Sequence, residues 1–220
     1  MFLELVDSLR CVRAHEDSWL VARADEMVER HVVEGALGCP VCLTRYPIHE
    51  GVGDFTLGET TPRHARGVAA EQIGALALRA AALLGLGEAG GIVVLAGEWS
   101  AAANELIAMT EHVMVLALDY SQELQSGGAL SLARIADTLP LAAASVRGIA
   151  VDAAHATPSL LAGAGRALAP GGRLIAPASA RIPDTLRELA RDDEHWVAAA
   201  SSGSKSSAPV SIAVNRHSPA

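Results

Sequence analysis

The hydrophobic positions after residue 90 form short apolar runs, separated by segments in which apolar residues recur at helical spacing. Short continuous apolar runs are typical of strands buried on both faces of a sheet. The runs predict strands at 92–96, 113–118, 132–136, 146–151, 173–176, 195–200 and 210–214. Helices are predicted at 100–110, 157–169 and 183–191. Alternating strands and helices predict a mostly parallel sheet with helices on both faces, and the last two strands predict an antiparallel edge.

A long helix is predicted ahead of the first of these strands. Thr61 is a candidate N-cap residue, and Pro62 suits the first helical position. Apolar residues recur at three- and four-residue spacing from Ile73 onward, and Gly85 is typical of a residue that ends a helix. The pattern therefore predicts one helix over residues 62–85.

The composition changes near residue 55 and divides the chain into two predicted units. Residues 1–55 contain all three cysteines, residues 56–61 form a predicted linker, and residues 62–220 form the predicted α/β domain. The polar loop 201–208 is predicted to join the last two strands into a mobile hairpin.

Charge and cysteine usage narrow the function classes. The net charge of −8 and the absence of a basic run give no indication of nucleic-acid binding. No apolar run reaches the ~20 residues of a membrane span, and the acidic start does not resemble a secretory signal. Three unevenly spaced cysteines do not suggest a disulfide framework. We therefore expect a cytoplasmic protein without a membrane partner.

Acidic residues follow the second and third predicted strands, and a specific turn precedes the fifth. Asp119 follows the apolar run 115–118, and Asp137 begins the segment Asp-Thr-Leu-Pro-Leu. The predicted helix from residue 160 leads through Pro170-Gly171-Gly172 into the next strand. In this order, residues 62–215 resemble a class I S-adenosylmethionine (SAM)-dependent methyltransferase domain.

The resemblance implies a Rossmann-like methyltransferase sheet, mostly parallel with an antiparallel last strand. It also implies cofactor-binding roles for three residues. Gly97 would lie in the cofactor loop, Asp119 would bind the ribose hydroxyls, and Asp137 would lie near the adenine amino group. Acids commonly end strands and begin turns, so ordinary turn roles for both aspartates stay open.

The loop after the first strand departs from the family's pattern. Family members carry an acid at the strand end and several glycines, whereas this chain has Leu-Ala-Gly97-Glu98-Trp99-Ser. Glu98 would place a carboxylate near the cofactor's own carboxylate, and Trp99 is bulky where backbone must approach a ligand closely. Either Trp99 occludes the cofactor crevice, or it turns into a helix interface and leaves the crevice open.

His155 follows the fourth predicted strand and is the one catalytic candidate. The carboxyl ends of parallel strands carry the reactive groups of this fold class, and a histidine there suits a general base. The competing interpretation is a solvated loop histidine without a role. No other catalytic residue is indicated.

The N-terminal unit carries metal-ligand spacing. Cys39-Pro-Val-Cys42 places two thiolates where they can share one tetrahedral zinc ion. Cys11 and His15, four residues apart, complete the candidate set of Cys11, His15, Cys39 and Cys42. A unit of about 50 residues gains stability from such a structural ion.

The residues after this pair carry a second resemblance. Cys39 to Gly51, with its Tyr-Pro-Ile segment, resembles the small zinc-ribbon domain of activators of tRNA and protein methyltransferases. That resemblance implies a zinc-ribbon-like domain at 1–55. The family's first half is a second C-x-x-C, which Cys11-Val-Arg-Ala-His15 replaces, so His31 and His49 stay open as the fourth ligand. A redox-active cysteine pair and a metal-free remnant of the ribbon also stay open.

Two principal functions follow from these features. The first is a methyltransferase-like protein with a degraded SAM loop that acts as a non-catalytic binding or scaffolding module. The second is an active SAM-dependent methyltransferase with an unorthodox loop, and a pocket for a different small ligand is a third interpretation. A protein partner or a homodimer is expected with the first. No motif identifies a methyl acceptor.

Overall fold

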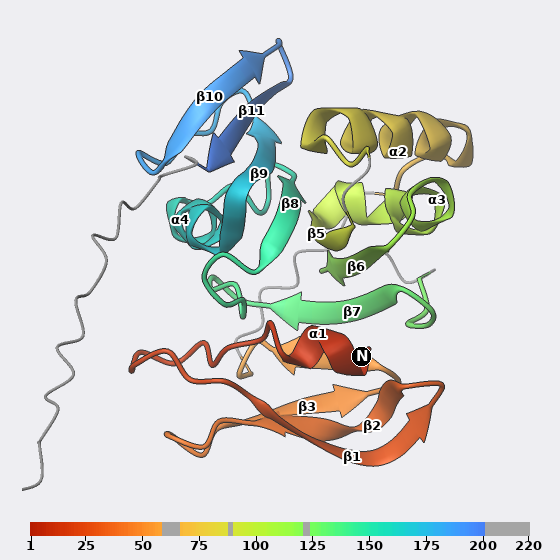
Figure 1. Ribbon diagram of the computed structural model, residues 1–220, viewed down its shortest axis with the longest axis vertical. Helices are drawn as coiled ribbons and strands as arrows, with labels where there is room; N and C mark the ends of the chain where they lie inside the picture. Colours follow the sequence, from red (N-terminus) through yellow and green to blue (C-terminus); the bar gives the residue numbers. More distant parts are fainter. Residues whose placement is uncertain (59–66, 88–89, 121–123, 201–220) are drawn as a thin grey trace, which may run out of the picture.

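The computed structural model describes residues 1–58, 67–87, 90–120 and 124–200 (Figure 1). Seven of its strands form an α/β sheet in the order β7-β6-β5-β8-β9-β11-β10. The strands are β5 (Gly91–Ala96), β6 (Val113–Leu118), β7 (Leu130–Ile135), β8 (Val146–Val151), β9 (Leu168–Pro177), β10 (Leu186–Arg191) and β11 (His195–Ala200).

The pairing of these strands is parallel from β7 to β9 and antiparallel around β11. β11 lies between β9 and β10 and runs against both. This order is that of a Rossmann-like methyltransferase sheet, so the expected fold class is confirmed.

Helices cover both faces of this sheet. They are α2 (Ala70–Leu84), the 3-10 helix η1 (Gly97–Ala102), α3 (Ala103–Met109) and α4 (Pro158–Ala167). Successive residues of β5 point to opposite faces, as the pleat of a strand requires. Val94 packs in the cluster that contains α4, whereas Val93 and Leu95 pack in the cluster that contains α2 and α3. The strands are therefore buried on both faces, which explains their continuous apolar sequence.

The N-terminal segment extends the same sheet. It contains the short helix α1 (Leu3–Val6) and the strands β1 (Val21–Val28), β2 (His31–Gly38), β3 (Arg45–His49) and β4 (Val52–Phe55). These strands form an antiparallel meander, and β4 pairs in parallel with β7. Within the described residues the result is one sheet of eleven strands, with β1 at one edge and β10 at the other (Figure 1). The division of the chain at residue 55 stays a prediction.

Most predicted elements are confirmed, with shifted ends. Helix α2 ends at Gly85, whose positive φ of 67° is the left-handed conformation typical of a glycine after a helix. α2 begins at Ala70, and the predicted cap at Thr61 and Pro62 lies outside the described residues. The helix predicted from residue 100 begins earlier, as η1 at Gly97. No described helix is long and apolar enough to cross a membrane.

The helix predicted over residues 183–191 is wrong. Residues from Leu186 to Arg191 form β10, which pairs with β11. Leu, Arg, Glu and Ala favour helix locally, but pairing with a neighbouring strand outweighs so small a preference. The turn before β11 is fixed by Asp192, whose Oδ1 accepts hydrogen bonds from the amides of Glu194 and His195. The predicted hairpin with 210–214 lies outside the described residues.

Candidate functional site

Three neighbouring strands end at one edge of the sheet and bring the predicted site residues together. β5 pairs in parallel with β6 on one side and β8 on the other, so Gly97, Asp119 and Asp152 share this edge. The helices that follow β5 and β8 lie on opposite faces. Such a switch point is where doubly wound sheets form a ligand crevice.

A buried histidine bridges this edge. His155 Nε2 lies 3.0 Å from Asp119 Oδ2, and His155 Nδ1 lies 2.6 Å from Asp152 Oδ1. The exposed fractions of the His155, Asp119 and Asp152 side chains are 1%, 8% and 11%. The interpretation as a solvated loop histidine is therefore wrong: His155 lies between two carboxylates. We call Asp119, His155 and Asp152 the carboxylate–histidine bridge.

Contacts within the bridge shift the pKa values of His155 and Asp152 in opposite directions. Burial by itself lowers the pKa of His155, but its contacts with Asp119 and Asp152 outweigh burial, and the pKa is raised. Burial likewise raises the pKa of Asp152, and the contact with His155 outweighs it, so that pKa is lowered. Both shifts favour an imidazolium ion beside an ionised Asp152 carboxylate.

The glycine of the predicted cofactor loop serves the same bridge. Gly97 has a φ of +63°, and a Cβ atom placed there would lie 1.9 Å from Asp152 Oδ2. The amide of Glu98 donates a 3.1 Å hydrogen bond to the same oxygen. The space beside the Gly97 backbone, which glycine leaves open, is therefore occupied by the carboxylate of Asp152.

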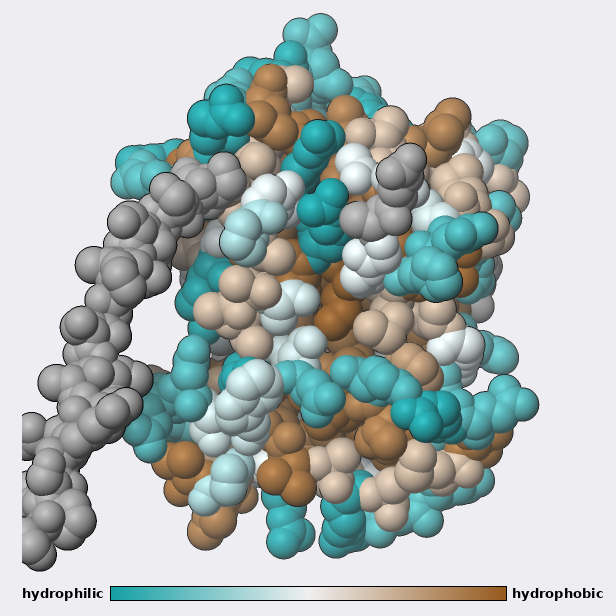
Figure 2. Space-filling model, in the orientation of Figure 1, coloured by the Kyte–Doolittle hydropathy of each residue, from teal (hydrophilic) through white to brown (hydrophobic). Residues whose placement is uncertain are grey.

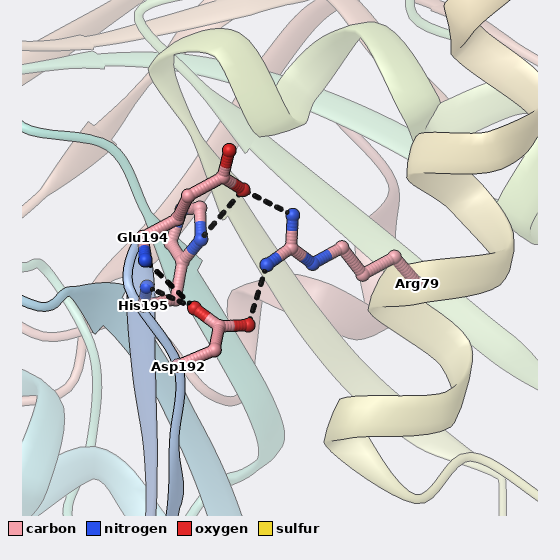
Figure 3. Close-up of polar contacts among 4 residues, drawn as sticks. All are labelled: Arg79, Asp192, Glu194 and His195. Atoms are coloured by element: carbon pink, nitrogen blue, oxygen red, sulfur yellow. Dashed lines mark hydrogen bonds and ion pairs between the residues drawn. The ribbon is translucent and has the colours of Figure 1, made fainter.

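Trp99 turns away from this edge. Its side chain is fully buried in the cluster beneath α2 and α3, and its ring meets the edge of His195 at a centroid distance of 5.3 Å. Figure 3 shows Arg79 of α2 reaching the turn before β11, where it contacts Asp192 and Glu194 at 2.8 and 2.6 Å. The same turn leads into His195, whose ring contacts Trp99. Of the two orientations considered for Trp99, the structure has the helix interface.

The two aspartates expected at the cofactor have different surroundings. Asp119 also accepts a 3.2 Å hydrogen bond through Oδ1 from the amide of Ile135. Asp137, two residues further on, is exposed, and its carbonyl accepts a hydrogen bond from the Ser159 hydroxyl. Sequence reasoning missed Asp152, although its place three residues before His155 was a usable signal.

A second candidate site lies in the N-terminal segment. The ligand atoms of Cys11, His15, Cys39 and Cys42 all lie within 4.8 Å of one another. His15 Nε2 lies 3.1 Å from Cys11 Sγ and 3.5 Å from Cys39 Sγ, and the Cys11 and Cys42 sulfurs are 3.6 Å apart. Zn–S bonds of ~2.3 Å in a tetrahedron place sulfurs about 3.7 Å apart. The cluster could therefore hold a metal ion such as zinc.

Neighbouring groups orient the donors of this cluster. His15 Nδ1 lies 2.6 Å from the carbonyl of Glu16, which leaves Nε2 for a metal. The Tyr46 hydroxyl lies 3.0 Å from Cys11 Sγ. The hydroxyl and amide of Thr44 lower the pKa of Cys42 to about 6, which favours the thiolate. Three sulfurs and one imidazole nitrogen suit zinc.

The remaining histidines of the segment have different partners. His31 is buried, with Nδ1 3.3 Å from the carbonyl of Glu29, and His49 pairs with Glu34 at 3.0 Å. Of the three candidate histidines, the described geometry brings only His15 to the cysteines.

Comparison with known proteins gives structural likeness alone. No family model and no curated protein matches the chain. One similar structure is a complex between the Haloferax volcanii Trm112 methyltransferase activator and the putative methyltransferase. Its identity is 22% and its TM-score 0.36, over 49% of this chain and 56% of that chain. Our chain thus spans little more than half of that relative.

Two further similar structures are methyltransferases. One is an S-adenosyl-L-methionine methyl transferase from Silicibacter pomeroyi DSS-3, with 13% identity and a TM-score of 0.44 over 61% of this chain and 99% of that chain. The other is the MycE methyltransferase of the mycinamycin pathway with Mg and SAH, with 8% identity and a TM-score of 0.46 over 63% and 51%. At these sequence identities and TM-scores, the similarity does not indicate an activity for this chain. The fold assignment rests on the strand order.

Proposed function

We propose that this chain is a non-catalytic, methyltransferase-like binding or scaffolding module whose cofactor crevice is closed by its own side chains. The observation that carries the proposal is the carboxylate–histidine bridge across the ends of β5, β6 and β8. The bulk of Trp99 plays no part in closing the crevice, because that side chain packs beneath α2 and α3.

The bridge engages the groups that a cofactor would need. Asp119, the expected partner of the ribose hydroxyls, contacts His155. The amide of Glu98, in the expected cofactor loop, already donates to Asp152. A ligand entering here would have to separate a buried ion pair, which costs about 3–5 kcal/mol. At ~1.4 kcal/mol per tenfold change in affinity, that is a loss of roughly a hundredfold or more.

We also propose that Cys11, His15, Cys39 and Cys42 bind a structural zinc ion. Four protein donors complete a tetrahedral shell and leave no open position for a substrate, which is the pattern of a structural rather than a catalytic site. The ion would tie the segment around Cys11 to the turn between β2 and β3. When bound, zinc supplies a cross-link, and no chemical step depends on it.

Thermal unfolding of the zinc-loaded protein with SAM or its demethylated product tests the proposal. A ligand present at 100 times its dissociation constant would add about 2.7 kcal/mol of stability. We expect no rise in melting temperature at millimolar concentrations of either compound. A concentration-dependent rise that Asp119→Ala removes would instead support an active methyltransferase with an unorthodox loop.

A further inference from the structure

The free edge of the sheet at β1 has an unusual sequence. Among the described residues, β1 pairs with β2 on one side only (Figure 1). Seven of the eight residues of β1 are exposed. Val21 and Val28 at its two ends are 62% and 54% exposed, and Met27 is 46% exposed. Proteins protect such edges because unpaired backbone groups and apolar side chains invite another strand.

The opposite edge of the sheet differs in its apolar positions. Both edge strands carry three charged residues, but β1 begins and ends with an exposed valine, whereas β10 begins with the buried Leu186 and ends with Arg191. Figure 2 shows hydrophobic and hydrophilic residues interspersed along the lower end of the molecule, where Figure 1 places β1. Among the described edge strands, exposed apolar residues at both ends therefore distinguish β1.

A register shift places two opposite charges on one face of β1. Arg23 lies opposite Ala36 of β2, and after the irregularity at Asp25, Glu26 lies opposite Glu34. Residues 34 and 36 of a strand share a face, and directly opposed residues of an antiparallel pair share a face as well. Arg23 and Glu26 therefore share a face, which three-residue spacing would not give in a regular strand.

We infer that β1 pairs antiparallel with β1 of a second copy of this chain, about a two-fold axis between Ala24 and Asp25. In that register Val21 faces the partner's Val28, and Arg23 faces the partner's Glu26. Two-fold symmetry makes each of these pairs occur twice. The segment Val-Ala-Arg-Ala-Asp-Glu-Met-Val thus complements itself in charge and in apolar ends.

The ion pair that Arg23 makes within one copy does not prevent it from pairing with a second copy. Arg23 donates two hydrogen bonds to Asp25, of 3.1 and 2.7 Å, but the two side chains are 68% and 52% exposed. Exposed ion pairs contribute little stability, so a partner's carboxylate can compete for Arg23. Because a two-fold pairing uses the β1 edge of both copies, it closes as a dimer rather than growing into a filament. The inference does not depend on the closed crevice, so either proposal can fail alone.

Charge reversal tests the register. We expect sedimentation of the zinc-loaded full chain to show a monomer–dimer equilibrium. Arg23→Glu and Glu26→Arg should each weaken dimerisation about tenfold or more, because each places like charges opposite one another twice. An equimolar mixture of the two variants should form a heterodimer, since all charge pairs are then opposite again. The double variant should also dimerise.

Arg187→Glu on the β10 edge is the matched control and should leave the equilibrium unchanged. Three results would overturn the inference. They are a wild-type chain that stays monomeric at every concentration, a dimer that tolerates Arg23→Glu, and a mixture of variants that fails to associate.

Discussion

Removal of the bridging imidazole is the sharpest perturbation of the carboxylate–histidine bridge. His155→Ala leaves the Asp119 and Asp152 side chains buried on either side of the vacated ring position, without a cation between them. The variant loses two charge-assisted contacts, of 3.0 and 2.6 Å, each worth about 1.5–3 kcal/mol. Breaking a buried ion pair on one side costs about 3–5 kcal/mol. We therefore expect the free energy of unfolding to fall by about 3–5 kcal/mol.

Denaturant unfolding followed by circular dichroism measures this loss, with His49→Ala as the matched control. His49 also contacts a carboxylate at 3.0 Å, but its side chain is 78% exposed, so its removal should leave the midpoint nearly unchanged. Equal midpoints for the two histidine variants would refute the structural role of the bridge.

The pH dependence of the loss gives an independent check. The folded-state pKa of His155 is raised above its ordinary value of 6.5, so its contribution is complete below that pH and is lost as pH rises through the raised pKa. The folded-state pKa of Asp152 is lowered below 3.8, so its contribution is present above that pH and is lost on further acidification. The difference between wild type and His155→Ala should therefore be largest between these two values. A difference independent of pH would contradict the ion pair.

Three further predictions concern other parts of the structure. Gly97→Ala should lower the free energy of unfolding by about 1–3 kcal/mol or more, because the new Cβ atom would meet Asp152 and the residue has a positive φ. Denaturant unfolding measures this loss, and a variant as stable as wild type would contradict the close approach of Asp152 to Gly97. Wild type should hold one zinc ion per chain by elemental analysis, and Cys39→Ser should lower both metal content and melting temperature; less than half a zinc in wild type would remove the metal proposal. Burial lowers the pKa of His195, and the charge of Arg79 lowers it further. Arg79→Ala should therefore raise that pKa in a nuclear magnetic resonance titration. An unchanged pKa would show that the contacts in Figure 3 do not persist in solution.

The parallel strands were predictable because a strand that is buried on both faces of a sheet has an almost continuously apolar sequence. β5 and β8 are apolar along nearly their whole length, so length and composition suffice to find them. β10 was not predictable in the same way. Only its first residue is buried, and the rest of the strand is charged or exposed and favours helix locally. Its conformation depends on pairing with β11, which a local pattern does not contain.

The two candidate sites also differ in how much of their arrangement a local sequence pattern contains. The candidate metal ligands include two close pairs along the chain, Cys11 with His15 and Cys39 with Cys42, so ligand spacing identified all four residues that the fold brings together. The bridge joins Asp119 to His155 across 36 residues and depends on the adjacency of β5, β6 and β8. Sequence reasoning placed Asp119 and His155 at strand ends but treated them separately. It left two orientations open for Trp99, because the direction of that side chain is set by packing against α2 and α3, which a local pattern does not contain.

The most direct test of the closed crevice is a nitrogen-15 resonance measurement of the His155 ring in the zinc-loaded protein, with and without millimolar SAM. Near the ordinary histidine pKa of 6.5, we predict that both ring nitrogens carry protons that exchange slowly with water, because the raised pKa and the two carboxylates hold them. Added SAM should leave these signals unchanged. A neutral ring in fast exchange, or ring signals that shift in a saturable way with SAM, would contradict the account.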